Sequence, residues 1–265
     1  MRLAAFQMEA VAGDVATNLA MISDAAAEAK AKSAEVMVAP ELAVTGYGAG
    51  DAIRELAQPV DGAQVAALAE VAAKNSITLV AGFAERAGSA IYNSAALIEP
   101  NGRRVFYRKC QLYGAYEKAI FAPGDRAPAV FDLNVMKTGG MKAGLLICFD
   151  VEFPEYTRRL ALAGAEIALV PTAQPDNESA PFIAEKIVPV RAFENGIAIV
   201  YADHAGKDER FAYAGRSCIV MPDGSDAARA GPTGAAVIVA DYEPAAYDKD
   251  RAENPYLADR RADLV

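Results

Sequence analysis

The sequence predicts an α/β fold in which helices lie outside mixed β-sheet. Two Ala-rich helical patterns alternate with the first three strand-like runs of the 265-residue chain. Further strand candidates follow in quick succession, and Asn101-Gly102 between two of them is a strong signal for a hairpin turn. An alternating opening followed by hairpins indicates one mixed sheet, or two sheets, with the helices packed outside.

Hydrophobic periodicity places the individual elements along the chain. Apolar runs bounded by turn residues predict strands, and apolar residues on one helical face predict helices. Pro154 suits the first turn of a helix and Gly164 suits its end, so one helix is expected between them. The expected strands are 3–7, 35–39, 77–83, 89–98, 103–107, 129–133, 142–147, 166–170, 197–202, 217–221 and 235–240, and the expected helices are 16–32, 64–74, 154–163 and 182–194.

Composition describes an ordinary soluble globular protein. The chain is 53% hydrophobic and 23% charged, and neither a linker nor a repeat divides it. We therefore expect a single domain over 1–265, with a polar tail from about 242 to 265 that carries a short helix and could pack on a partner subunit.

Charge and cysteine usage restrict the partners and the compartment. The formal net charge of -9 comes without a Lys/Arg cluster, so nucleic acid and anionic membranes are poor partners. No run of roughly 18 apolar residues predicts a membrane span, and the N-terminal run is too short for a signal peptide. Cys110, Cys148 and Cys218 form an odd, sparse set, which favours a reducing cytoplasm over a disulfide framework.

Three reactive residue types stand at the ends of three predicted strands. Cys148 follows the apolar run 143–147 and precedes a predicted helix, which is how α/β folds present a nucleophile. Glu41 and Lys109 likewise come just after predicted strands. Because ligands collect beyond such strand ends in open α/β sheets, we expect the three side chains to meet in one pocket.

A thiol with a reference pKa of about 8.5 needs a base or a positive field to act as a nucleophile at neutral pH. The chain has one histidine, His204, so a Cys/His dyad depends on that residue alone. A carboxylate can replace histidine when burial raises its pKa, and Glu41 follows a buried-looking segment. A lysine such as Lys109 would stabilise the oxyanion formed when sulfur adds to a carbonyl.

The combination of Glu41, Lys109 and Cys148 resembles the catalytic set of the nitrilase superfamily of carbon-nitrogen hydrolases. The matching segments occur in the expected order and cover nearly the whole chain. The three main motifs resemble 40–47, 107–124 and 144–155, and supporting similarity lies in 170–173, 191–195, 215–217 and 222–224.

The resemblance implies an αββα sandwich of two mixed β-sheets flanked by helices, a cofactor-free reaction and a homodimer. It makes Cys148 the nucleophile, Glu41 the general base, and Lys109 the oxyanion donor together with the backbone N–H of Phe149. Glu117 matches a second glutamate that orients the lysine and the leaving group. A water activated by Glu41 would then hydrolyse the thioester.

Departures from the family pattern indicate the substrate. Relatives that hydrolyse N-carbamoyl amino acids or ω-amides carry arginine shortly after the cysteine, whereas Val151 and Glu152 stand there in this chain. An acidic residue near the mouth would repel a substrate carboxylate. Nitrile-cleaving relatives usually have Cys-Trp-Glu, whereas Phe149-Asp150 follows the cysteine here.

The sequence thus favours an amidase that converts a small neutral or cationic carboxamide to an acid and ammonia. A nitrilase or an N-carbamoyl or ω-amide hydrolase is the alternative within the family. The expected pocket walls come from Tyr47, Tyr116, Phe149, Thr172 and Ala173.

Other interpretations remain for the same residues. Cys148 alone would be a buried structural thiol, and Glu117 alone would pair with Lys118 or Arg126. A non-catalytic binding module or a thiol-sensing protein would be a function of another class, although the chain has no Cys-x-x-Cys pair. No metal site is expected, because the three cysteines and the histidine are dispersed.

Overall fold

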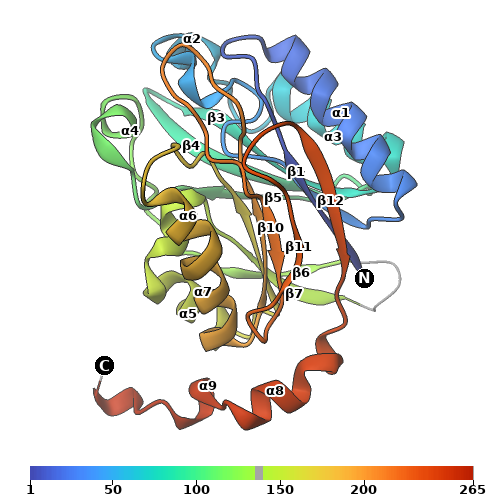
Figure 1. Cartoon of the computed structure of the whole chain (residues 1–265). Helices are drawn as coiled ribbons and strands as arrows, with labels where there is room; N and C mark the ends of the chain where they lie inside the picture. The colour runs from blue at the N-terminus through green and yellow to red at the C-terminus, as the bar shows by residue number, and fades with distance from the viewer. Residues whose placement is uncertain (135–139, 265) are drawn as a thin grey trace.

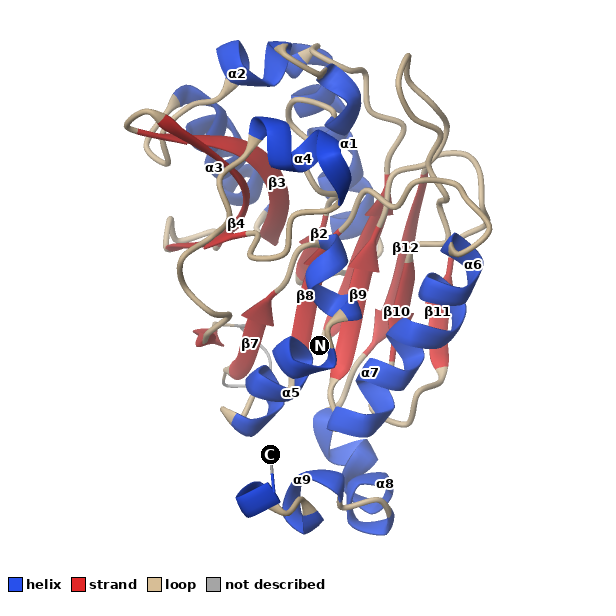
Figure 2. Cartoon of the chain, turned by 90° about the vertical axis from the view of Figure 1, so that its left-hand side faces the viewer, coloured by secondary structure: helices blue, strands red, loops and turns tan. Residues whose placement is uncertain are grey.

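Two mixed β-sheets packed face to face form the centre of the protein, and helices cover both outer faces (Figures 1 and 2). The computed structural model describes residues 1–134 and 140–264. Within that part of the chain, each of the two sheets has six strands. The expected αββα sandwich is therefore confirmed.

The first sheet has the strand order β12-β1-β2-β3-β4-β5. Strands β1, β2 and β3 are parallel, and the other pairs are antiparallel. Parallel neighbours need a crossover connection, and helices α1 and α3 provide it on the outer face. The bounds are β1 Arg2–Gln7, α1 Val15–Ala31, β2 Val36–Val38, α3 Ala63–Asn75, β3 Thr78–Ala87, β4 Ala90–Ile98, β5 Arg104–Arg108 and β12 Ala236–Asp241.

The second sheet has the strand order β11-β10-β9-β8-β7-β6. Strands β7, β8 and β9 are parallel, and α5 and α7 connect them across the other outer face. A short α6 and a π-helical turn, η3, lead into α7. The bounds are β6 Val130–Leu133, β7 Met141–Leu145, α5 Pro154–Leu162, β8 Ile167–Pro171, α6 Ala180–Phe182, η3 Ile183–Ile187, α7 Val188–Asn195, β9 Ala198–Ala202, β10 Cys218–Val220 and β11 Asp226–Arg229.

The main core lies between the sheets. Val38 and Val80 of the first sheet and Leu169 and Val200 of the second belong to one buried cluster. The opposite faces of the same strands pack on the helices, as Met37 and Leu79 do under α1 and α3. Strands buried on both faces read as continuous apolar runs, which is why they were visible in the sequence.

Most predicted elements are present within one or two residues of their expected ends. The Asn101-Gly102 hairpin is confirmed, since Gly102 has φ 88° and the N–H of Glu99 donates to the carbonyl of Arg103 at 2.9 Å. Helices α2 (Ala52–Leu56) and α4 (Gly114–Ile120) and the polar edge strand β11 were missed, because they lack an apolar pattern of useful length. The 3-10 turns η1 (Tyr47–Ala49) and η2 (Cys148–Glu152) were not predicted either.

The C-terminal segment leaves the sandwich and runs below it (Figure 1). It contains the expected short helix, α8, together with further short helical turns, and none of the residues in η4, α8 or α9 is buried. The bounds are η4 Pro244–Tyr247, α8 Asp248–Glu253, α9 Tyr256–Asp259 and η5 Ala262–Leu264. Across residues 1–134 and 140–264, no helix combines the length and the apolar composition that crossing a bilayer requires.

Segments that follow strands of both sheets meet at one end of the sandwich. The backbone N–H of Glu41, just after β2, donates to the carbonyl of Thr172, just after β8, at 3.3 Å. The N–H of Gln111, just after β5, donates to the carboxylate of Asp150, beyond β7, at 2.8 Å. The sheets therefore bring the three predicted reactive residues to the same end of the fold.

Candidate active site

Glu41 lies in a tight turn whose backbone is held on several sides. The N–H of Gly82 donates to the carbonyl of Pro40 at 3.0 Å, and the N–H of Val44 donates to the carbonyl of Gly82 at 3.2 Å. A Cβ atom on Gly82 would lie 2.6 Å from the Cα of Glu41 and 2.2 Å from the next backbone nitrogen. Only glycine allows β3 to approach the turn this closely.

His204 also supports this turn. Its Nε2 lies 2.7 Å from the carbonyl oxygen of Glu41, and since a carbonyl only accepts, the ring donates this hydrogen bond. The side chain is buried, and burial lowers the pKa of His204 to about 4, so the ring is neutral near pH 7. Through this hydrogen bond, His204 holds the backbone of Glu41 in place.

Lys109 carries a fully buried ammonium between two carboxylates. Its Nζ lies 2.6 Å from Oε1 of Glu41 and 2.6 Å from Oε1 of Glu117, and all three side chains are 0–1% exposed. Burial by itself would lower the pKa of Lys109, but the charges of Glu41 and Glu117 raise it well above its usual value. The lysine is therefore a permanent cation at this position.

Glu117, on α4, makes hydrogen bonds through both of its oxygens. Oε1 accepts from Lys109 and from the hydroxyl of Tyr47 at 2.9 Å, and Oε2 accepts from the backbone N–H of Tyr113 at 2.8 Å. Its ion-pair partner is thus Lys109, and not Lys118 or Arg126.

The two oxygens of Glu41 have different surroundings. Oε1 accepts from Lys109 and from Nδ2 of Asn93, the latter at 2.5 Å. Oε2 is buried and has no hydrogen-bond partner among residues 1–134 and 140–264. Burial raises the pKa of Glu41 to about 7 against the opposing field of Lys109, and the charge of Glu117 adds to the rise. A carboxyl group with this pKa can both take up and release a proton near neutrality.

Cys148 begins a 3-10 turn, η2 (Cys148–Glu152), directly beyond β7. Its φ of 45° lies in the left-handed region, which is strained for a residue with a side chain and typical of functional positions. Burial and the charge of Glu41 raise the pKa of its thiol well above the usual value, whereas Lys109 and the backbone N–H of Ala173 act in the opposite direction. The sulfur therefore shares one electrostatic site with Glu41 and Lys109, and it is held as a neutral thiol.

Asp150 joins the segments that carry the lysine and the cysteine. Its fully buried carboxylate accepts from the N–H of Gln111 at 2.8 Å, from the hydroxyl of Tyr107 at 2.9 Å and from the N–H of Ile147 at 3.1 Å. Burial raises the pKa of Asp150 to about 6. The residue thus stabilises the turn at Cys148 and fastens it to the end of β5.

Sequence reasoning missed the supporting roles of Asn93, Asp150 and His204. Asn93, which is 1% exposed, stands with Ser94 in a polar break within the largely apolar strand β4, and this interruption is the signal that it left in the sequence. The contacts that join Asp150 to the end of β5 and His204 to Glu41 gave no local signal, because those partners lie 39 or more positions away along the chain.

The residues expected to line the pocket surround this cluster. Tyr47 donates to Glu117, and the hydroxyl of Tyr116 donates to the carbonyl of Tyr47 at 2.6 Å, so both hydroxyls serve internal contacts. Thr172 accepts from the backbone of Glu41, and Ala173 directs its N–H toward the sulfur of Cys148.

Phe149 lies at a more open position than Tyr47, Thr172 and Ala173, which are buried. Its ring is half-buried and packs edge-on against Tyr113 at a centroid distance of 5.2 Å and against Phe153 at 4.9 Å. Tyr113 is itself 38% exposed. These rings therefore extend from the turn at Cys148 toward the surface.

Comparisons with known proteins agree with this arrangement. The carbon-nitrogen hydrolase family profile matches residues 2–252. The chain is 38% identical to a nitrilase from Pyrococcus abyssi, covering 82% of this chain and 79% of the relative. It is 31% identical to an (R)-stereoselective amidase from Pseudomonas sp., covering 98% of this chain and 92% of the relative.

Solved structures of an amidase from Nesterenkonia sp. are similar over the whole chain. One has 34% sequence identity and a TM-score of 0.87, and it covers 100% of this chain and 94% of that chain. A mutant of the same amidase carries the acetamide moiety of fluoroacetamide attached covalently to its active-site cysteine.

The close approach of Gly82 to Glu41 generates a prediction. Gly82→Ala forces the turn away from β3 and displaces the carboxyl group, since the added Cβ would lie 2.2 Å from a backbone nitrogen. A displacement of about 1 Å lowers the reaction rate by up to about 100-fold in such sites. We expect alkylation of Cys148 by iodoacetamide, followed by mass spectrometry, to slow by about 10- to 100-fold.

Gly231→Ala is the matched control, because a Cβ there meets nothing within 4 Å. Circular dichroism of both variants verifies folding. Wild-type alkylation kinetics in a folded Gly82→Ala protein would contradict the positioning role.

Proposed function

Because the chain belongs to the carbon-nitrogen hydrolase family and is a hydrolase of non-peptide carbon-nitrogen bonds, we propose that it is an amidase acting on a small neutral or cationic carboxamide. The products would be a carboxylic acid and ammonia. The observation that carries the proposal is the buried Glu41–Lys109–Glu117 cluster around a strained, buried Cys148.

In the acylation step, Oε2 of Glu41 takes the thiol proton of Cys148 while the sulfur attacks the carbonyl carbon. A C–S bond forms, and the carbonyl electron pair moves to oxygen. Lys109 and the backbone N–H of Phe149 stabilise that oxyanion. When the oxyanion collapses, the C–N bond breaks and Glu41 returns the proton to the departing ammonia.

In the deacylation step, Glu41 takes a proton from water, which attacks the thioester carbonyl. The C–S bond breaks, and the sulfur recovers the proton from Glu41. The sum is amide plus water giving acid plus ammonia, with the cysteine regenerated. Glu117 holds Lys109 in place through both steps, since its oxygens bind the lysine, Tyr47 and the backbone of Tyr113.

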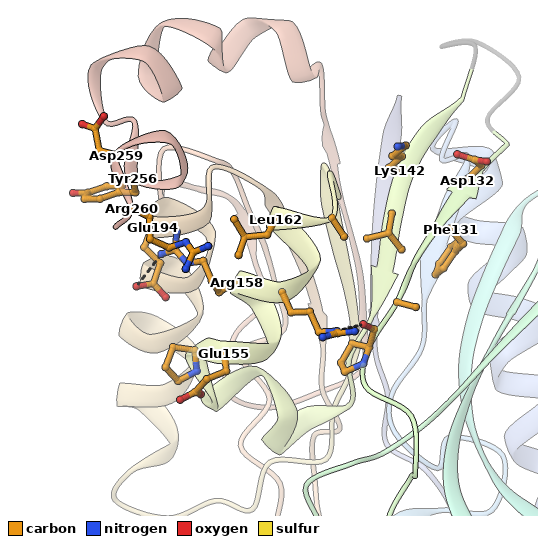
Figure 3. A pocket seen from close by; sticks show the side chains of 16 residues that line it. Phe131, Asp132, Lys142, Glu155, Arg158, Leu162, Glu194, Tyr256, Asp259 and Arg260 are labelled. Atoms are coloured by element: carbon orange, nitrogen blue, oxygen red, sulfur yellow. Dashed lines mark hydrogen bonds and ion pairs between the residues drawn. The ribbon is translucent and has the colours of Figure 1, made fainter. Parts of the chain in front are cut away.

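We also propose that two copies of the chain associate through the outer face of α5 and α7. Leu162 of α5 and Val190 of α7 are each 47% exposed, and Phe182 of α6 is 61% exposed. A cavity of about 1240 Å³ lies between α5, the edge strand β6 with its neighbour β7, and the C-terminal segment. Figure 3 shows Leu162 and Tyr256 on its walls. A second copy would bury this apolar surface. It would also bury the C-terminal helices α8 and α9, in which no residue is buried within the single chain.

The three cysteines support a proposal about the compartment. Cys110, Cys148 and Cys218 are all free thiols. A nucleophilic thiol works only while it stays reduced, so we propose that the protein acts in a reducing compartment such as the cytoplasm.

Removing the nucleophile tests the reaction. Wild-type protein should release ammonia from a panel of small amides, and Cys148→Ala should lower the rate by about 1000-fold or more because no thioester can form. Mass spectrometry of the wild type mixed with the same amides should reveal an acyl group on Cys148.

Cys218→Ala is the matched control, because this second buried cysteine lies under α7 rather than in the cluster. Turnover by Cys148→Ala at the wild-type rate would overturn the mechanism. Release of ammonia from butyronitrile but from none of the amides would favour a nitrilase instead.

The pKa of Glu41, about 7, predicts the pH dependence. A general base acts in its deprotonated form, so kcat/KM for pentanamide should rise about tenfold per pH unit below pH 7 and level off above it. Lys109 should stay charged through this range, because its pKa is raised well above its usual value.

The carboxyl group of Glu152 also has a pKa raised to about 7 by burial, so it provides the control. The rising limb should persist in Glu152→Gln. A profile that is flat between pH 5 and pH 8 would contradict the role of Glu41.

Self-association is tested by light scattering after gel filtration. We expect a dimer for the wild type and a monomer for a Leu162→Glu, Val190→Glu double variant, since two charges would then face the apolar partner surface. Val11→Glu is the control, because Val11 is also exposed, at 42%, but lies before α1 on the opposite side of the sandwich. A monomeric wild type would exclude the proposed association.

A further inference from the structure

Glu152 is a half-buried carboxylate that the proposed reaction does not use. Its side chain has neither an ion pair nor a hydrogen bond with residues in the described part of the chain, 1–134 and 140–264. Burial raises its pKa to about 7, and the more distant charges of Lys109 and Arg191 act against that rise. An acidic group placed this way has a cost in stability unless something binds it.

The two cations near Glu152 are already engaged. Lys109 is held between two other carboxylates. The guanidinium of Arg191 donates to the carbonyls of Val151 and Glu152 at 3.1 and 2.8 Å and pairs with the carboxylate of Glu194 at 3.1 Å. These contacts hold the backbone of Glu152 in place but leave its carboxylate without a cation of its own.

Glu152 lies beside the nucleophile and next to aromatic rings. It is the last residue of η2, the turn that begins with Cys148. In a 3-10 helix, residues three apart lie on the same side, which places Glu152 on the side of Phe149. The half-buried ring of Phe149 packs against Tyr113, which is 38% exposed. The carboxylate of Glu152 and the ring of Phe149 thus lie on the same side of the turn that begins with Cys148.

We propose that Glu152, together with the rings of Phe149 and Tyr113, binds a positively charged group on the acyl chain of the substrate. The inference rests on the proposed amidase function and narrows its substrate class to amides that carry an ammonium group. A carboxylate attracts such a group directly, and aromatic faces favour cations further. The same arrangement disfavours substrates with a carboxylate at that position.

The test compares two amides of equal length that differ in charge. The probes are 4-aminobutanamide, which carries an ammonium group, and pentanamide, which has a methyl group in its place. Assays at about pH 8 keep the substrate amine protonated and most of the Glu152 carboxyl ionised. For the wild type, kcat/KM should be higher for 4-aminobutanamide than for pentanamide.

Glu152→Gln removes the charge and nearly keeps the shape. The ratio of kcat/KM for 4-aminobutanamide to that for pentanamide should fall by about tenfold or more, mainly through a higher KM for the cationic amide. Glu70→Gln on α3 is the matched control, because it removes one exposed carboxylate on the other face of the sandwich, and its ratio should equal that of the wild type.

The outcomes separate this inference from the function on which it rests. A ratio that is the same in the wild type and Glu152→Gln would overturn the inference, as would equal losses on both amides. If wild-type protein hydrolyses pentanamide in either case, the amidase proposal stands without the cationic subsite. If the wild-type protein hydrolysed none of the amides, the amidase proposal itself would be overturned.

Discussion

The buried ion cluster of Lys109, Glu41 and Glu117 is the interaction on which the rest of the site depends. Taking three charged groups out of water is costly, and the cost is offset only where geometry and additional hydrogen bonds are good. Here Asn93 and Tyr47 donate to the two carboxylates. The cluster has one more negative charge than positive, and this excess, together with burial, keeps the pKa of Glu41 near neutrality.

Many of the contacts around the site fix the backbone of the turns that carry the reactive side chains, rather than the side chains themselves. Gly82 and His204 fasten the turn that carries Glu41, and Asp150 fastens the turn that carries Cys148 to the end of β5. Each of these contacts joins segments that belong to different strands. A reaction that needs a sulfur, a base and an oxyanion donor at fixed separations requires this kind of backbone support.

The outer helices connect the site to the surface that we propose for self-association. Helix α5 begins soon after Cys148, and Arg191 of α7 donates to two carbonyls of the cysteine turn. Helices α5 and α7, which carry the exposed side chains of Leu162 and Val190, therefore also support the turn that runs from Cys148 to Glu152. Burial of these helices by a second copy would reinforce the part of the fold that carries Cys148.

The sequence by itself determined the fold class and the positions of Glu41, Lys109 and Cys148 after strands, because hydrophobic periodicity and local turn residues are properties of neighbours along the chain. The tertiary structure decided that Glu117 pairs with Lys109 rather than with Lys118 or Arg126, and it alone decided that His204 binds a backbone carbonyl and that Asp150 joins two segments. It also decided which carboxyl groups have raised pKa values. Those properties arise from burial and from partners brought together by two packed sheets, and no local pattern encodes which polar groups will meet.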